Sequence, residues 1–276
     1  MVAAALRAPA GAALLACGLA GLGAACGAAP EPSAPAVLRV VFPEGFTRAQ
    51  MAERVGAVRE IARRRRGVTP RMTARGYLAA SASSPLPGRF AGDRVRRPLE
   101  GFLFPATYEF LPETTARRLV SLQVAAFRRG WAKVDLRFAR SKNLTSYDVL
   151  IIASMIEREV VVPRERRLVA AVIYNRLRAR MPLGIDAALR YGLDIPATES
   201  ITKAQLASDS PYNTRNRLGL PPTPISNPGL ASMQAAAHPA KVPYLYFARK
   251  PDKRRHYFTA SLDDFNRYLA KQGYGP

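Results

Sequence analysis

Residues 151–160, IIASMIEREV, form an apolar run that ends in two glutamates with one arginine between them. The apolar run begins further upstream, where Thr145 and Asp148 have the spacing of a capping box at a helix start. Pro163 would end such a helix, because proline has no backbone N–H to donate. The sequence therefore predicts a helix over residues 145–160 whose apolar sides pack in the core.

The two glutamates at the end of this helix cannot act on the same bond. Successive residues turn by about 100° around a helix, so Glu157 and Glu159 point roughly 200° apart. Glu159 falls on the side where the largest apolar side chains gather, and Glu157 falls nearer the small polar Ser154. The apolar residues beside Glu159 are Ile152, Met155 and Ile156. Burial raises the pKa of a carboxyl group, as a general acid near neutral pH requires, which favours Glu159 for that role.

The alternative is that both glutamates only end the helix in ion pairs with neighbouring arginines. The candidate partners are Arg158, Arg164 and Arg166. On spacing alone, both interpretations remain open.

Other kinds of chemistry have less support in the sequence. The chain has two histidines, His238 and His256, and no HExxH motif, so no metal site and no cofactor are expected. Each histidine is expected to be structural. SITK, residues 200–203, matches the SxxK pattern of some serine enzymes, but their partner motifs are missing. Thr202 and Gln205 fit a capping box better.

Composition and charge limit the possible classes of function. The 276 residues are 48% hydrophobic, which suits one or two globular domains, and the formal net charge of +22 favours a polyanionic partner. Nucleic acid, anionic lipid and an anionic cell-wall polymer are all polyanions. The leader at residues 1–29 has one charge, Arg7, and is long enough to span a membrane, although a cleaved signal peptide is also possible. Either interpretation exports the chain, which argues against nucleic acid.

The cysteines bear on how the chain is anchored. Cys17 and Cys26 both lie in the leader, so no disulfide is expected in the exported part. LLAC before Cys17 faintly resembles a lipoprotein box. The expected location is the cytoplasmic membrane, with a single span and the rest of the chain on the outer side. The alternative is a secreted or lipid-anchored protein after signal cleavage.

The rest of the chain predicts an α+β protein of two modules. A proline-rich linker at residues 30–36 precedes a small module at 37–98 and a larger domain at 99–272. The small module has a short strand followed by a helix, which Thr47 and Gln50 cap and Gly67 ends. The larger domain has further helices, a long loop and a closing hairpin. These are expected at about residues 114–133, 164–180 and 231–238 for the helices, 210–229 for the loop, and 244–250 with 255–261 for the hairpin.

Five stretches in order resemble the YceG-like (MltG) family of endolytic murein transglycosylases. They are EGFLFPATYEF (100–110), IIASMIEREV (151–160), VIYNRL (172–177), SPYNTR with GLPPTPISNPG (210–215 and 219–229), and AAAHPAKVPYLYF (235–247). The resemblance covers residues 37 to about 269.

The resemblance implies a membrane-anchored enzyme that cuts nascent peptidoglycan between N-acetylmuramic acid and N-acetylglucosamine and so ends strand elongation. It implies a LysM-like module at 37–98, peptidoglycan strands as substrate and peptidoglycan synthases as partners, and it places the catalytic glutamate on Glu159. Six residues are implied to bind substrate. They are Glu100, Tyr108, Asp186, Tyr212, Asn213 and Thr214. The alternative is a non-catalytic peptidoglycan-binding membrane protein of the same fold.

Overall fold

The computed structural model describes residues 37–82, 86, 90 and 97–273. The expected leader and the expected linker lie outside the described residues, as does most of the turn-rich stretch between residues 83 and 96. Within the described ranges, no helix combines the length and the apolar character that a membrane crossing needs.

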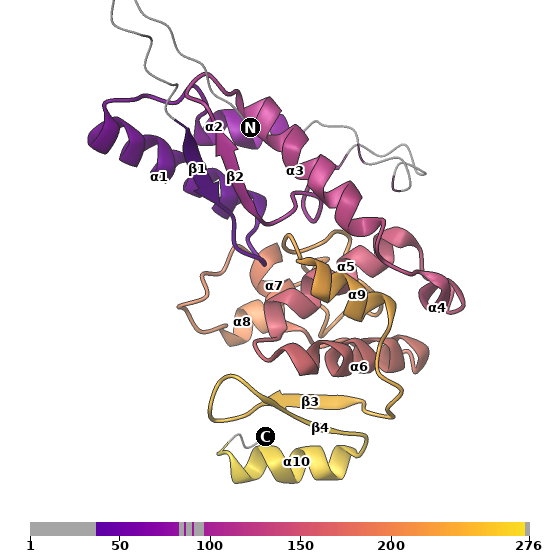
Figure 1. The fold of residues 1–276 in the computed structure, drawn as a ribbon. Coiled ribbons are helices and arrows are strands. Elements are labelled where there is room, and N and C mark those ends of the chain that lie inside the picture. Colours follow the sequence, from indigo (N-terminus) through magenta and orange to yellow (C-terminus); the bar gives the residue numbers. More distant parts are fainter. Residues whose placement is uncertain (1–36, 83–85, 87–89, 91–96, 274–276) are drawn as a thin grey trace, which may run out of the picture. The chain divides into compact units, whose positions relative to one another are not determined.

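The first elements have the order strand, helix, helix, strand. They are β1 (Leu38–Val41), α1 (Arg48–Arg66), α2 (Ala74–Ala82) and β2 (Thr107–Phe110) (Figure 1). β1 and β2 pair in antiparallel register. The capping box predicted for α1 is confirmed, as is its end at a left-handed Gly67 (φ 62°). The second strand lies beyond the boundary expected at residue 98, and that boundary stays a prediction.

The central helices are built around α5 (Ser146–Glu159). Its predicted capping box at Thr145 is present, and every residue from Val149 to Ile156 is buried. α5 packs against α6, α7 and α9, so the apolar run of the sequence has partners on several sides. The helices after β2 are α3 (Ala116–Trp131), α4 (Arg137–Arg140), α5, α6 (Arg166–Arg178), α7 (Asp186–Gly192), α8 (Lys203–Leu206) and α9 (Leu230–Ala237), with a 3-10 turn at Pro163–Glu165.

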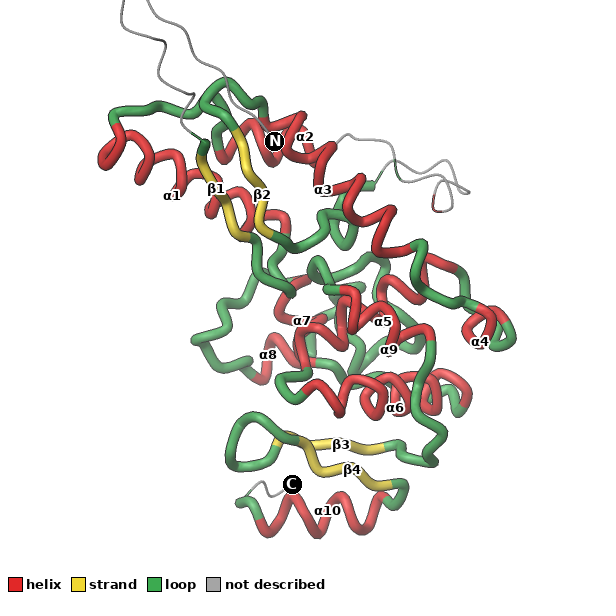
Figure 2. The backbone as a smooth tube through the Cα atoms, in the orientation of Figure 1, coloured by secondary structure: helices red, strands yellow, loops and turns green. Residues whose placement is uncertain are grey.

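The chain closes with the predicted hairpin and one further helix. β3 (Tyr246–Arg249) and β4 (His256–Thr259) form an antiparallel pair, and α10 (Leu262–Lys271) packs on both strands. Figure 2 shows this hairpin with α10 beside it. The sequence analysis missed α10, although Ser261 caps it by accepting a hydrogen bond from the backbone of Asp264. The α+β class is confirmed.

Two of the stretches that carry the family resemblance pack directly on each other. Gly101 has a φ of +88°, and a Cβ at this position would lie 2.7 Å from the ring of Pro224. Only glycine adopts this conformation readily and allows so close an approach. The next residue of the long loop, Ile225, donates its backbone N–H to the hydroxyl of Ser154 in α5, and this hydroxyl donates to the carbonyl of Ile151. The loop is therefore held against the core helix.

Candidate active site

Glu159 is the last residue of α5, and its side chain lines a cavity of about 680 Å³. Other residues of this wall come from α6, α7, β3, β4 and α10, so the cavity exists only in the folded chain. The side chain of Glu159 is 13% exposed. A largely buried carboxyl group that still faces a cavity can exchange a proton with a bound molecule.

The surroundings of Glu159 favour its acid form. Burial is the largest influence and raises the pKa of this carboxyl group. Arg249, with Nη2 3.7 Å from Oε2, and then His256 act in the opposite direction. The negative charge of Asp186 raises the pKa again, and the backbone N–H of Ala187 lowers it by donating a hydrogen bond. The net effect is a raised pKa, which agrees with the prediction from the helical wheel.

Glu157 has a different environment, as the helical spacing predicted. Its side chain is 6% exposed, and Oε2 accepts a hydrogen bond of 2.9 Å from the backbone N–H of Gly229, the residue before α9. Its Oε1 lies 3.9 Å from Arg166, one of the ion-pair partners that the sequence suggested. For Glu159 the charged partner is instead Arg249, 90 residues away. Glu157 thus anchors the start of α9.

Glu157→Gln is expected to lower the free energy of unfolding by about 1–2 kcal/mol, because the amide weakens a charge-assisted bond to the first turn of α9. Thermal or urea unfolding measures this effect. Glycan cleavage by the folded fraction should be largely unchanged, since Glu157 does not line the cavity of Glu159. A loss of cleavage without a loss of stability would move the catalytic assignment from Glu159 towards Glu157.

Asp186 is brought into the same cavity as Glu159. It is the first residue of α7, and Oδ1 lies 2.7 Å from both Nε and Nη2 of Arg215, another residue of the cavity wall. The carboxylate is 44% exposed. Of the six residues expected to bind substrate, Asp186 is the one that lines this cavity.

Tyr212, Asn213 and Thr214 lie in the segment just before Arg215, and their side chains hold that segment in place. Thr214 Oγ1 accepts a hydrogen bond of 2.9 Å from the backbone of Ile185, beside the start of α7. Asn213 donates to two backbone carbonyls, and the Tyr212 hydroxyl lies 2.7 Å from that of Thr223. These contacts position Asp186 and Arg215; a direct contact with substrate stays a prediction.

Glu100 and Tyr108 do not line the cavity of Glu159. Glu100 is 4% exposed and accepts hydrogen bonds from the Arg48 backbone, the Asn227 amide and the Tyr191 hydroxyl. Burial raises its pKa to about 7, although these donors act against the rise. The Tyr108 hydroxyl donates to the carbonyl of Phe104. Substrate binding by either residue stays a prediction.

The sequence analysis missed Arg249 and the role of His256 in the cavity. The two residues are directly opposite each other in the β3–β4 pair, so their side chains share one face of the hairpin. That face lines the cavity of Glu159. The hairpin itself was predicted, and reading its register would have placed both residues together.

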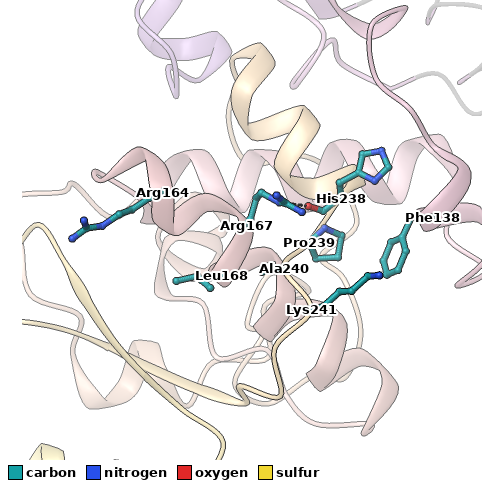
Figure 3. Close-up of a pocket in the computed structure, with 8 residues that line it drawn as sticks. All are labelled: Phe138, Arg164, Arg167, Leu168, His238, Pro239, Ala240 and Lys241. Carbon is teal, nitrogen blue, oxygen red and sulfur yellow. Dashed lines mark hydrogen bonds between the residues drawn. The ribbon is translucent and has the colours of Figure 1, made fainter.

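Two further cavities within the described ranges have no carboxylate in their walls. Figure 3 shows one of about 480 Å³, where Arg167 Nε donates a hydrogen bond of 2.9 Å to the carbonyl of His238. Its wall carries Arg164, Arg167 and Lys241 but no acid. Neither cavity can supply the proton for acid catalysis, whereas the cavity of Glu159 can.

Comparison with known proteins identifies the family of the chain. Residues 28–271 match the model of the YceG-like family. The chain belongs to this family. It is 32% identical over 267 residues to the endolytic murein transglycosylase of Streptococcus pneumoniae (strain ATCC BAA-255 / R6). This match covers 89% of this chain and 46% of that protein. It is 35% identical over 181 residues to the endolytic murein transglycosylase of Bacillus subtilis (strain 168), covering 65% and 49%.

A solved structure of a YceG-like protein from Listeria monocytogenes has the same fold. The TM-score is 0.69 at 30% sequence identity, and the match covers 84% of this chain and 76% of that one. The YceG-like assignment from five sequence stretches is thereby confirmed. The chain spans about half the length of the curated relatives that it matches.

Proposed function

We propose that this YceG-like protein is an endolytic lytic transglycosylase of peptidoglycan. It cleaves the bond between N-acetylmuramic acid and N-acetylglucosamine within nascent strands, leaves a 1,6-anhydro end and so stops elongation. The observation that carries the proposal is Glu159, a carboxyl group with a raised pKa in the wall of a cavity. The relatives named endolytic murein transglycosylase support it.

The reaction uses Glu159 twice. As an acid it donates its proton to the glycosidic oxygen, and the bond to the anomeric carbon of the muramic acid breaks. As a carboxylate it then takes the proton of the C6 hydroxyl of the same sugar, whose oxygen forms the new bond to the anomeric carbon. Atoms and protons balance, and the enzyme returns to its starting form. The attacking group is part of the substrate, so no water has to be positioned.

Five arginines in the cavity wall support a substrate that carries negative charge. They are Arg158, Arg176, Arg190, Arg215 and Arg249, against two acidic side chains, Glu159 and Asp186, of which Glu159 favours its neutral form. The stem peptides of peptidoglycan carry carboxylates close to the muramic acid. An excess of guanidinium groups attracts such a strand and holds its peptides beside the scissile bond.

A second function, hydrolysis, has one observation in its favour, the carboxylate of Asp186 in the same cavity. Glycosidases use two carboxyl groups, one as acid and one as base or nucleophile. The ion pair with Arg215 fits a different role for Asp186, in which its charge stabilises the positive charge that develops on the sugar ring. The two functions differ in their product, a reducing end against a 1,6-anhydro end.

Asp186→Asn distinguishes these roles. We expect the rate to fall roughly 10–100-fold, because a charge facing the transition state is removed, while the remaining product keeps its 1,6-anhydro end. Mass spectrometry of the released glycans measures both quantities. Complete loss of cleavage, together with reducing ends from the unmodified enzyme, would assign hydrolysis and make Asp186 the second catalytic carboxylate.

The deciding experiment incubates the full chain with purified cell-wall sacculi and analyses the soluble and insoluble glycans by mass spectrometry. The expected result is cleavage within long strands, which produces shorter strands with new 1,6-anhydro ends. Binding without any cleavage would instead support the non-catalytic peptidoglycan-binding protein. Strands shortened only from their ends would contradict the endolytic assignment.

We further propose how the enzyme binds the cell wall, where it is located and which partners it has. The module at residues 37–98, with β1, α1 and α2, is a LysM-like wall-binding module. The leader holds the protein at the cytoplasmic membrane, and peptidoglycan synthases are partners of the enzyme. Cell fractionation tests the location. Full-length protein in the membrane fraction is expected, and a shortened, released form would indicate that the leader is cleaved.

A further inference from the structure

Arg249 contacts Glu159 at two points, the side chain and the backbone. Its Nη2 lies 3.7 Å from Oε2 of Glu159 and donates a long hydrogen bond of 3.4 Å to the Glu159 carbonyl. Glu159 ends α5, and the residue four positions on, Pro163, has no N–H to donate to this carbonyl. The guanidinium therefore lies at the negative end of the α5 dipole and beside the carboxyl group at the same time.

The hairpin that carries Arg249 is fixed to α6, so the contact with Glu159 is part of the fold. Asn175 of α6 donates hydrogen bonds of 2.9 and 2.8 Å to two backbone carbonyls just before β3. Its neighbour Arg176 donates one of 2.6 Å to a third carbonyl of the same segment. A charge held by a rigid element acts on its partner without first having to be ordered.

The other four arginines of the cavity wall have different partners. Three of them donate hydrogen bonds to backbone carbonyls, and the fourth, Arg215, pairs with Asp186. The three are Arg158, Arg176 and Arg190. Within the described residues, Arg249 is the arginine that forms an ion pair with Glu159.

The reaction described above needs Glu159 in both of its protonation states. Burial favours the acid form, but it also makes the carboxylate costly once the proton has moved to the glycosidic oxygen. A guanidinium beside the carboxyl group stabilises the carboxylate and keeps its own charge. A buried acid that must also act as a base therefore gains from such a neighbour.

We propose that Arg249 is a positioning residue that stabilises the Glu159 carboxylate between its two proton transfers and so sets the upper pH limit of cleavage. The inference rests on the proposed function and deepens it. While Glu159 holds its proton, Arg249 contacts a neutral carboxyl group and the end of α5. After the proton has left, the same guanidinium faces a full negative charge. This attraction is lost again when the C6 hydroxyl returns a proton.

Other groups face Glu159 and set the background of this effect. Burial raises the pKa of the carboxyl group most strongly, and Arg249 is the largest influence that lowers it. His256 of β4 also lowers this pKa, Asp186 of α7 raises it, and the backbone N–H of Ala187 lowers it. Because these groups are unchanged when Arg249 alone is replaced, loss of the guanidinium should raise the pKa further.

The kinetic test compares Arg249→Gln with Arg249→Lys. The alkaline limb of the pH profile of kcat/KM, where the acid form of Glu159 is lost, should move up by about 0.5–1 unit in Arg249→Gln. Below the limb, kcat should fall roughly 3–10-fold, because the carboxylate formed in the first step has lost its partner. Arg249→Lys keeps the charge, so its limb should stay near that of the unmodified enzyme.

The matched control is Arg190→Gln, which removes the same charge from the same cavity wall but from a side chain that donates to a backbone carbonyl. Its KM for glycan strands should rise, while its alkaline limb stays in place. Three results would overturn the inference: a limb that does not move up in Arg249→Gln, an equal movement in Arg190→Gln, or a rise in KM as the sole effect of Arg249→Gln. The last result would make Arg249 a substrate-binding residue.

A titration without substrate separates this inference from the proposed function. The full chain is labelled with ¹³C at the side-chain carboxyl groups of glutamate, and the Glu159 signal is identified by its absence from Glu159→Gln. Its NMR titration midpoint should be higher in Arg249→Gln than in the unmodified chain, whether or not the protein cleaves glycans. An unchanged or lower midpoint would overturn the inference even in an active enzyme. A thermal melt of each variant confirms that folded proteins are compared.

Discussion

Glu159→Gln is expected to lower the formation of 1,6-anhydro ends by about 10²–10⁴-fold, because glutamine keeps the shape of the side chain but cannot donate and recover a proton. The substrate should still bind, since the arginines of the cavity wall are unchanged. The measurement is mass spectrometry of the glycans released from sacculi, with binding followed by co-sedimentation.

The matched control for this substitution is Glu157→Gln, two residues away on the same helix. It makes the same change, from a carboxyl group to an amide, in a side chain that contacts the start of α9 and does not line the cavity. The control should keep most of its cleavage rate, whereas Glu159→Gln should show the fall given above. Anhydro ends produced at a normal rate by Glu159→Gln would overturn the assignment of the acid.

The largest expected effect on stability belongs to Glu100. Glu100→Ala is expected to lower the free energy of unfolding by roughly 3–5 kcal/mol, because the buried Asn227 amide and Tyr191 hydroxyl lose their acceptor. The Arg48 backbone N–H at the start of α1 loses its acceptor as well. Urea unfolding followed by circular dichroism measures the loss. A change below about 1 kcal/mol would mean that water replaces the carboxyl group easily.

Glu100 also predicts how stability depends on pH. Burial raises its pKa from 4.5 to about 7 in the folded chain, so the folded state holds this proton more tightly than the unfolded state. Its contribution is fully present below about pH 4.5 and is lost as the pH rises to about 7, by roughly 1.4 kcal/mol per unit at most. Glu100→Gln cannot titrate, so the fall between these two values should be absent from its stability profile. An unchanged fall would assign it to other groups.

The sequence by itself determined the local structure around the site. The apolar run with Thr145 and Asp148 defined α5, and the 100° turn per residue separated Glu157 from Glu159. The sequence also predicted the caps of α1 and α8 and the closing hairpin. These features depend on neighbours within about four residues or on a single strand pair, so a short window of sequence contains their cause.

The tertiary structure decided what each charged side chain faces. Asp186, Arg249 and His256 join Glu159 in one cavity, although 27 or more residues separate each of them from it. Packing of α7 against α5 and of β3 against α6 brings these residues together, and no periodic pattern of the sequence predicts such contacts. The same holds for Glu100, whose three donors come from Arg48, Tyr191 and Asn227, and for Glu157 at the start of α9. A pKa depends on burial and on charges brought together by folding, so the acid could be proposed from the helix but its surroundings only from the fold.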